Sequence, residues 1–151
     1  MTPEELAKER TMLVGKCDQL VDTYHAGAHD MHSLIEMRRE LAVWSYRLSA
    51  HTKDVHGQAG LGYLMRKYRI AESIVDARAS DAKKAMNILE QEAMKMPSVV
   101  AAHKDEIWAE AEKEALKSKL DFVKKVLESM NQELSILSHE AKTAHFQNTS
   151  T

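Results

Sequence analysis

Residues 116–141 read LKSKLDFVKKVLESMNQELSILSHEA, and this stretch decides the fold class of the chain. Apolar side chains recur in it at alternating spacings of four and three residues, flanked by Glu and Lys. The set is Leu116, Leu120, Val123, Leu127, Met130, Leu134, Leu137 and Ala141. This heptad pattern is typical of a helix that packs along another helix. We therefore expect a long helix over residues 99–141, with the stripe from Leu116 to Leu137 as an oligomerisation surface.

The length of this helix predicts association. At 1.5 Å per residue, a helix over residues 99–141 is roughly 65 Å long. A compact domain of this chain length is only about 30 Å across, taken as twice its expected radius of gyration. The helix therefore needs an antiparallel neighbour, another subunit or both, and we expect a homo-oligomer.

The composition extends the helical prediction to the whole chain. Only five Gly and two Pro occur in 151 residues, and aromatic residues make up 5%. Such a composition favours long helices with an aliphatic core. We expect an all-α fold of elongated helices with coiled-coil-like packing, as a helical hairpin or bundle, in a single domain over residues 1–145.

Local signals place the other helices at about residues 3–27, 31–56, 62–79 and 82–96, with a frayed tail at 146–151. Thr2, Pro3 and Glu5 fit a capping box with Pro at the first helical position. Asp30 fits the N-cap of the second helix. Within 62–79 the chain is again periodic, with apolar or small residues at Leu64, Tyr68, Ala71 and Val75.

Three glycines, Gly57, Gly60 and Gly62, give residues 57–62 the lowest helix propensity of the chain. Two interpretations remain open. The glycines either break the helix or mark a close packing point inside one very long helix.

The sequence indicates a reducing compartment. Cys17 is the one cysteine, which excludes an internal disulfide framework. The first residues lack the basic and apolar regions of a signal peptide, and no stretch approaches the roughly 18 apolar residues of a membrane span. We expect a cytoplasmic protein, in the host cytoplasm if a phage encodes it.

Catalytic chemistry has little support in the sequence. His25, His29 and His32 have spacings that could bring imidazoles together, but no carboxylate cluster accompanies them, and Gly27 lies between them. No nucleophile-and-base arrangement is suggested by spacing. We expect a non-enzymatic protein with no cofactor and no metal.

Charge is distributed unevenly along the chain. Residues 38–84 carry ten basic and five acidic side chains, between two acidic flanks. Basic residues interleaved with aromatic residues are typical of single-strand binding. The predicted nucleic-acid-binding residues are Arg38, Arg39, Arg47, Tyr63, Arg66, Lys67, Tyr68, Arg69, Arg78, Lys83 and Lys84. The alternative is that these cations lie on solvated helix faces.

Short motifs also carry a family resemblance over roughly residues 30–140. They are WSYRL at 44–48, YLMRK at 63–67, DAR at 76–78, IWAE at 107–110, LDFVKKVL at 120–127 and MNQELS at 130–135. In this pattern the chain resembles the small helical bacteriophage recombination proteins typified by the T-even phage mediator UvsY. The resemblance implies an oligomer that binds single-stranded DNA and loads a recombinase onto strands covered by single-strand-binding protein. The basic motif of that family would map onto Ala77 and Arg78, although Asp76 stands here where the family has a cation.

Two functions follow as expectations. The first is a phage-type recombination accessory protein that binds single-stranded DNA as a homo-oligomer. The alternative is a structural or adaptor protein, of virion, scaffold or regulatory type, that acts only through helix association.

Overall fold

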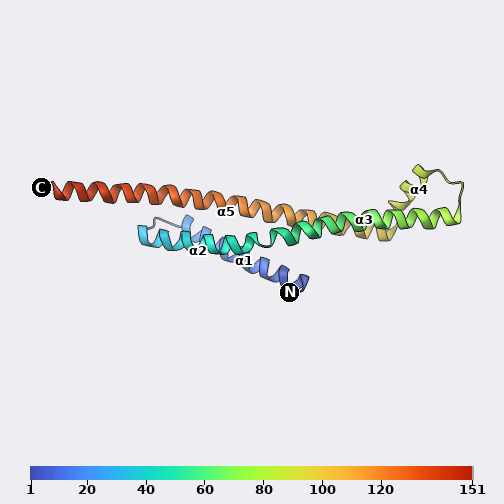
Figure 1. The fold of residues 1–151 in the computed structure, drawn as a ribbon, viewed down its shortest axis with the longest axis horizontal. Helices are drawn as coiled ribbons and strands as arrows, with labels where there is room; N and C mark the ends of the chain where they lie inside the picture. Colours follow the sequence, from blue (N-terminus) through green and yellow to red (C-terminus); the bar gives the residue numbers. More distant parts are fainter. Residues whose placement is uncertain (151) are drawn as a thin grey trace. The chain divides into compact units, whose positions relative to one another are not determined.

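A computed structural model describes residues 1–150, which form five helices and no strand. The helices are α1 (Pro3–His25), α2 (Met31–Ser49), α3 (Thr52–Ser80), α4 (Met86–Ala93) and α5 (Pro97–Thr149) (Figure 1). The predicted all-α fold class is confirmed. None of the described helices has the length and apolar character that a bilayer crossing requires.

The contacts divide the chain into two compact units, whereas the sequence predicts one domain over residues 1–145. Unit 1 holds Met1–His51 together with the part of α5 from Lys117 onward, and unit 2 holds Thr52–Leu116. The long helix α5 therefore contributes its N-terminal part to unit 2 and its C-terminal part to unit 1.

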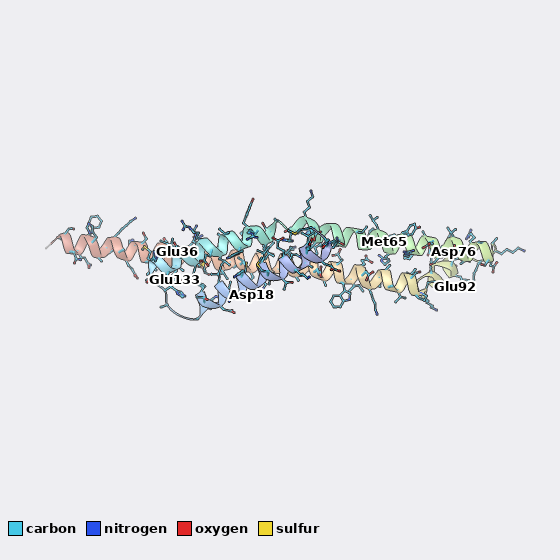
Figure 2. All side chains as sticks on the ribbon, turned by 90° about the horizontal axis from the view of Figure 1, so that it is seen from below. Asp18, Glu36, Met65, Asp76, Glu92 and Glu133 are labelled. Atoms are coloured by element: carbon cyan, nitrogen blue, oxygen red, sulfur yellow. The ribbon has the colours of Figure 1, made fainter. Side chains whose placement is uncertain are left out.

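Unit 1 is built from α1, α2 and the C-terminal part of α5. Its buried side chains include Leu13, Cys17, Leu34, Leu41, Leu48, Val123, Val126 and Met130. Two polar contacts join α5 to α1. Lys119 Nζ donates to Asp18 Oδ1 at 2.7 Å, and the Tyr24 hydroxyl donates to Glu133 Oε2 at 3.0 Å (Figure 2 labels Asp18 and Glu133). Burial raises the pKa of the Cys17 thiol, so this cysteine is an unreactive core residue.

Unit 2 is a helical hairpin in which α3 packs on the N-terminal part of α5, with α4 in the connection. Its buried side chains are Val55, Ala59, Leu89, Ala93, Val99, Ala102 and Leu116. The segment before α4 is tied to that helix by Lys84 Nζ, which donates to Glu92 Oε2 at 2.8 Å.

The predicted helix starts of the N-terminal region are confirmed. The Glu5 N–H donates to Thr2 Oγ1 at 3.2 Å, and the Thr2 N–H donates to Glu5 Oε2 at 2.6 Å, which completes the capping box. The Ser33 N–H donates to Asp30 Oδ1 at 2.7 Å. This hydrogen bond holds the pKa of Asp30 below its usual range.

The glycine-rich segment does not break a helix, because residues 57–62 lie inside α3. The expected helix 31–56 is instead interrupted at Ala50 and His51, where the His51 N–H bonds the Leu48 carbonyl at 3.0 Å, three residues back. His51 is buried, and its Nε2 lies 3.4 Å from Glu9 Oε2. The interruption thus coincides with a tertiary contact from α1. The residues around it do not have the low helix propensity that would have predicted a break.

The glycine segment matches the other interpretation, close helix packing, at Gly62. A Cβ atom built on Gly62 would lie 3.0 Å from the Cα of Glu106 on α5. This is closer than most Cβ contacts, so a residue without a side chain allows the two backbones to approach here without adjustment. Gly57 and Gly60 have no such neighbour within 4 Å, and nothing in the structure explains them.

The last three boundaries also differ from expectation. The helix expected at 82–96 is shorter, because Asp81 Oδ1 accepts the Lys83 N–H at 3.2 Å in a turn and α4 begins only at Met86. The helix expected at 99–141 begins at Pro97, which suits the first helical position, and it continues to Thr149. The tail expected to fray from residue 146 is therefore helical as far as Thr149, and residue 151 lies outside the described residues.

The three glycines of α3 give a matched test of this packing. We expect Gly57→Ala and Gly60→Ala to raise the free energy of unfolding by up to about 1 kcal/mol each, since Ala favours a helix interior over Gly. Gly62→Ala should give a smaller gain or a decrease, and Gly62→Leu should clearly destabilise, because the new side chain meets the α5 backbone. Urea unfolding followed by circular dichroism measures all four variants. Equal stabilisation by all three Ala substitutions would contradict the close approach.

Candidate functional site

The stripe predicted to drive oligomerisation is largely used within the chain. Leu116, Val123 and Met130 are buried, and Leu120, Leu127, Leu134 and Leu137 are half-buried. In unit 1, Leu120, Val123 and Leu127 line one groove together with Ala42 and Tyr46 of α2. Much of the periodicity of α5 is thus accounted for by packing within the chain, and the role of the stripe as an oligomerisation surface stays a prediction.

The predicted nucleic-acid-binding residues are divided between the two units. Arg38, Arg39 and Arg47 lie on α2 in unit 1. The residues from Tyr63 to Arg78 lie on α3, and Lys83 and Lys84 follow it, all in unit 2. The structure thus does not join the eleven residues into one surface within either unit.

Five of the nine predicted cations form ion pairs with carboxylates of the same unit. The pairs are Arg39 with Glu36 (3.6 Å), Arg47 with Glu9 (3.6 Å), Arg66 with Glu106, Arg69 with Glu72 (2.9 Å) and Lys84 with Glu92 (2.8 Å). A cation that already has a carboxylate partner releases fewer counterions on meeting a phosphate, so these five contribute less to nucleic-acid affinity than the sequence suggests.

The pair between Arg66 and Glu106 has the clearest structural role. The Arg66 Nε–H donates to Glu106 Oε2, and both side chains are mostly shielded from solvent. His103 Nδ1 lies 3.4 Å from the same carboxylate oxygen. The hydrogen bond from Arg66 is the main cause that holds the pKa of Glu106 below its usual range. Arg66 therefore fastens α3 to α5 and does not face outward for a phosphate.

The other four predicted cations have no ion pair with a described side chain. They are Arg38, Lys67, Arg78 and Lys83. Tyr63 and Tyr68 are exposed on α3. The Lys67 ammonium lies 5.5 Å from the centre of the Tyr63 ring, a cation–π arrangement. The predicted site as a whole stays a prediction, and these are its residues without a carboxylate partner among the described side chains.

The two faces of α3 have opposite environments. At 100° per residue, Val55, Ala59, Gly62 and Arg66 share one face, which is the face turned toward α5. The opposite face carries Leu61, Leu64, Tyr68, Ala71 and Val75 at successive spacings of 3, 4, 3 and 4. We call these five residues the outer seam.

The outer seam is exposed along its whole length. Leu61 is 53% exposed, Leu64 62%, Tyr68 58% and Val75 67%, and Ala71 is also exposed. Single exposed apolar residues are common on protein surfaces, but a heptad-spaced row of them is typical of a helix interface. The sequence shows Leu64 to Val75 as a periodic row, yet periodicity alone does not show that this row faces away from α5.

The two borders of the outer seam carry opposite charges. Lys67 lies on one border, and Glu72 and Asp76 lie on the other, where Arg69 pairs with Glu72 (Figure 2 labels Asp76). Next to the acidic border, Leu61 and Met65 line a groove of about 640 Å³ whose opposite wall is made by residues of α5, most of them small. The wall residues are Ser98, Ala101, Ala102, Asp105 and Ala109.

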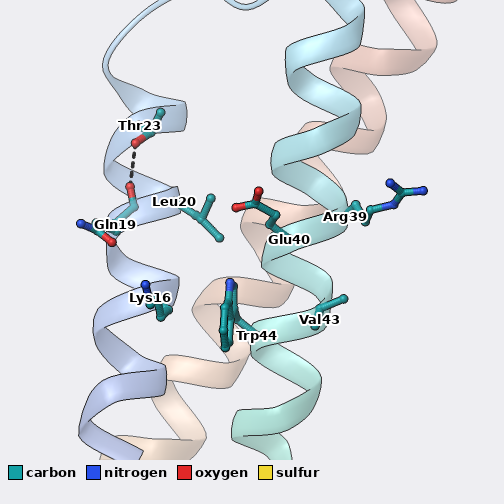
Figure 3. Close-up of a pocket in the computed structure, with 8 residues that line it drawn as sticks. All are labelled: Lys16, Gln19, Leu20, Thr23, Arg39, Glu40, Val43 and Trp44. Carbon is teal, nitrogen blue, oxygen red and sulfur yellow. Dashed lines mark hydrogen bonds between the residues drawn. The ribbon is translucent and has the colours of Figure 1, made fainter.

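A second groove, of about 520 Å³, lies between α1 and α2 in unit 1 (Figure 3). Leu20 and Trp44 point into it, whereas the guanidinium of Arg39 points away from α1. Lys16 and Arg47 lie over the Trp44 ring at 5.8 and 5.1 Å from its centre. The ring is thus already occupied by cations of the same unit. The polar lining of the groove comes from Lys16, Gln19, Thr23, Arg39 and Glu40.

Sequence reasoning does not anticipate two features of unit 2. Trp108 is 72% exposed on α5, and Ile107 beside it is 54% exposed. In the sequence, Ile107 and Trp108 stand out only as members of the IWAE motif. Their positions between Glu106 and Ala109, which are both half-buried, would place them on the outer side of the helix. They add apolar surface to unit 2.

The histidines considered for a metal site do not converge. His29 Nε2 lies 2.9 Å from the Tyr24 carbonyl, and His25 and His32 are exposed. Among residues 1–150, no group of three or more His, Cys, Asp or Glu side chains is arranged to hold an ion.

Comparisons with protein-family models, with curated proteins and with solved structures found no match to this chain.

The ion pair in unit 2 predicts a pH dependence of stability. Because the folded-state pKa of Glu106 is lowered, its contribution is fully present above the ordinary Glu pKa of 4.5 and is lost as the pH falls through the lower folded value. We expect the wild-type melting temperature to fall below pH 4.5 more steeply than that of Glu106→Gln, which should already be less stable at pH 6. The control is Glu110→Gln, which removes an exposed partner of Lys113 on the same helix. Thermal melts from pH 6 to pH 3 measure this, and parallel curves for wild type and Glu106→Gln would contradict it.

Proposed function

We propose that this chain is a non-enzymatic assembly protein whose working surface is the outer seam of α3, and that its partner is a second copy of the same chain. The observation that supports the proposal is the exposure of five heptad-spaced apolar or small residues on a helix whose opposite face is already packed. Burying one exposed Leu or Val side chain is worth roughly 1.5 to 3 kcal/mol when burial is complete. A row of such side chains therefore favours association.

A second copy fits this surface because the charges on the two sides of the outer seam are opposite in sign. Lys67 lies on one border and Glu72 on the other, so the same seam on another copy supplies a carboxylate for Lys67 and a cation for Glu72. The proposed site of action is the cytoplasm, since an unpaired buried thiol suits a reducing compartment.

Polar substitutions in the outer seam test the assembly. At a concentration on the order of tens of micromolar, light scattering should give wild type a mass above the 17.1 kDa of one copy. Leu64→Glu combined with Val75→Glu should give the mass of one copy, because each change would place a charge in the apolar interface. The unfolding free energy measured at low concentration should stay within about 0.5 kcal/mol of wild type, since both positions are exposed.

The matched control is Met12→Glu combined with Ile35→Glu, at two exposed apolar positions of unit 1. This control should assemble as wild type does. A monomeric wild type, or a seam variant that assembles unchanged, would overturn the proposed function.

Single-stranded DNA binding is the second candidate, in the mediator-type role that the family resemblance implies, with a recombinase and a single-strand-binding protein as partners. The observation that favours it is the set of four cations without an ion pair to a described side chain, Arg38, Lys67, Arg78 and Lys83, together with exposed Tyr63 and Tyr68. Phosphates could meet the cations of unit 2, and a base could stack on a tyrosine.

The salt dependence of oligonucleotide binding tests this candidate. If Lys67, Arg78 and Lys83 bind phosphates, changing all three to Ala should weaken binding to any single-stranded sequence. The slope of log affinity against log salt should become less steep by about 0.7 for each phosphate that is no longer neutralised. Fluorescence anisotropy with a labelled oligonucleotide measures both quantities. Lys117→Ala combined with Lys125→Ala, two exposed cations of α5, is the control and should change neither.

A further inference from the structure

We infer that α3 pairs with α3 of a second copy in parallel and in register, so that Lys67 of each copy forms an ion pair with Glu72 of the other. The inference rests on the proposed function and adds to it the orientation, the register and the residues that select them.

The register follows from the heptad positions. Leu61, Tyr68 and Val75 are spaced by seven residues, and Leu64 and Ala71 fill the intervening core positions. In a parallel two-stranded coiled coil, the residue that immediately precedes a core residue of one helix lies close to a residue of the other helix. That second residue is five positions further along the sequence. Lys67 precedes Tyr68 and Glu72 follows Ala71, so Lys67 meets Glu72 of the second copy, twice in a symmetric pair.

Antiparallel pairing would bring like charges together. In that orientation each border meets the same border of the other copy. Lys67 would then approach the border that carries Lys67 of the second copy, and Glu72 would approach the border that carries Glu72 of the second copy. Like charges placed opposite each other destabilise an interface, so the charge pattern selects the parallel orientation.

The contacts within unit 2 leave Lys67 accessible for such a pair. Lys67 is exposed and has no ion pair with a described side chain, while its neighbour Arg66 is held by Glu106. Glu72 accepts a hydrogen bond from Arg69 of its own helix at 2.9 Å. The side chains of Glu72 and Arg69 remain more than a third exposed, so the carboxylate can accept a second cation.

The seam has defined ends. Arg78 occupies the core position that follows Val75, and Gly57 occupies the one that precedes Leu61. A charge and a residue without a side chain both weaken a coiled-coil core, so the apolar pairing extends over about two heptads. Because the apolar interface is short, the charges beside it contribute much of the preference for one partner and one orientation, as flanking charges generally do in coiled coils.

Charge reversal and mixing test the register on the full chain. Lys67→Glu alone places two carboxylates against each other across the seam, and Glu72→Lys alone places two ammonium groups together. Each single variant should therefore dimerise roughly tenfold more weakly than wild type at low salt. An equimolar mixture of the two variants should restore wild-type affinity, because both contacts in the mixed pair join opposite charges. Sedimentation equilibrium gives each dissociation constant.

Salt and a matched variant complete the experiment. At 1 M salt the difference between wild type and each single variant should largely disappear, because exposed charges are screened. Lys104→Glu, an exposed change on α5, should leave the dissociation constant unchanged. A mixture that associates no better than its two components would overturn the parallel register. The proposed function would survive such a result, provided that wild type assembles and the variant with both Leu64→Glu and Val75→Glu does not.

Discussion

The close approach of α3 to α5 at Gly62 is the constraint on which unit 2 depends. A Cβ atom at this position would lie 3.0 Å from the Cα of Glu106, which is closer than most Cβ contacts, so glycine lets the two helices of the hairpin approach without displacing either backbone. Arg66 lies one turn later on the same face and bonds the Glu106 carboxylate. Together these two contacts fix the rotation of α3 about its own axis. Once that rotation is fixed, Leu64, Tyr68 and Val75 have to point away from α5.

Much of the helical framework could be predicted from local chemistry. The capping box at Thr2 and Glu5 and the N-cap at Asp30 are short-range arrangements, so sequence patterns suffice to find them. The interruption at His51 is not predictable in this way, because it coincides with a contact to Glu9, a residue that is far away in the sequence. The glycine segment is ambiguous in sequence for a similar reason, since the close approach of Gly62 to Glu106 joins two residues that are far apart in the chain.

Periodicity shows that a face is apolar but not what covers it. The stripe of α5 is the strongest signal in the sequence, and its residues Val123 and Met130 are buried in unit 1 beside α1 and α2. The weaker row on α3, from Leu61 to Val75, is the one that stays exposed. Charge counting has the same limit. Residues 38–84 carry an excess of cations, but the count cannot show that Glu9 and Glu106, from outside that segment, already pair with two of them.

The two candidate functions make different demands on Tyr68. A base that stacked on this ring would lie among apolar residues of the outer seam and would compete with Arg69, whose guanidinium lies 5.7 Å from the centre of the ring. A second copy of α3 would instead cover the ring and its apolar neighbours at the same time, and it would place its own charges beside opposite charges at the borders. Because the hydrophobic effect scales with apolar area removed from water, the helix partner uses all five residues of the outer seam, whereas a nucleic acid strand uses one. For this reason the geometry of unit 2 favours assembly over DNA binding, even though Lys67 could serve either function.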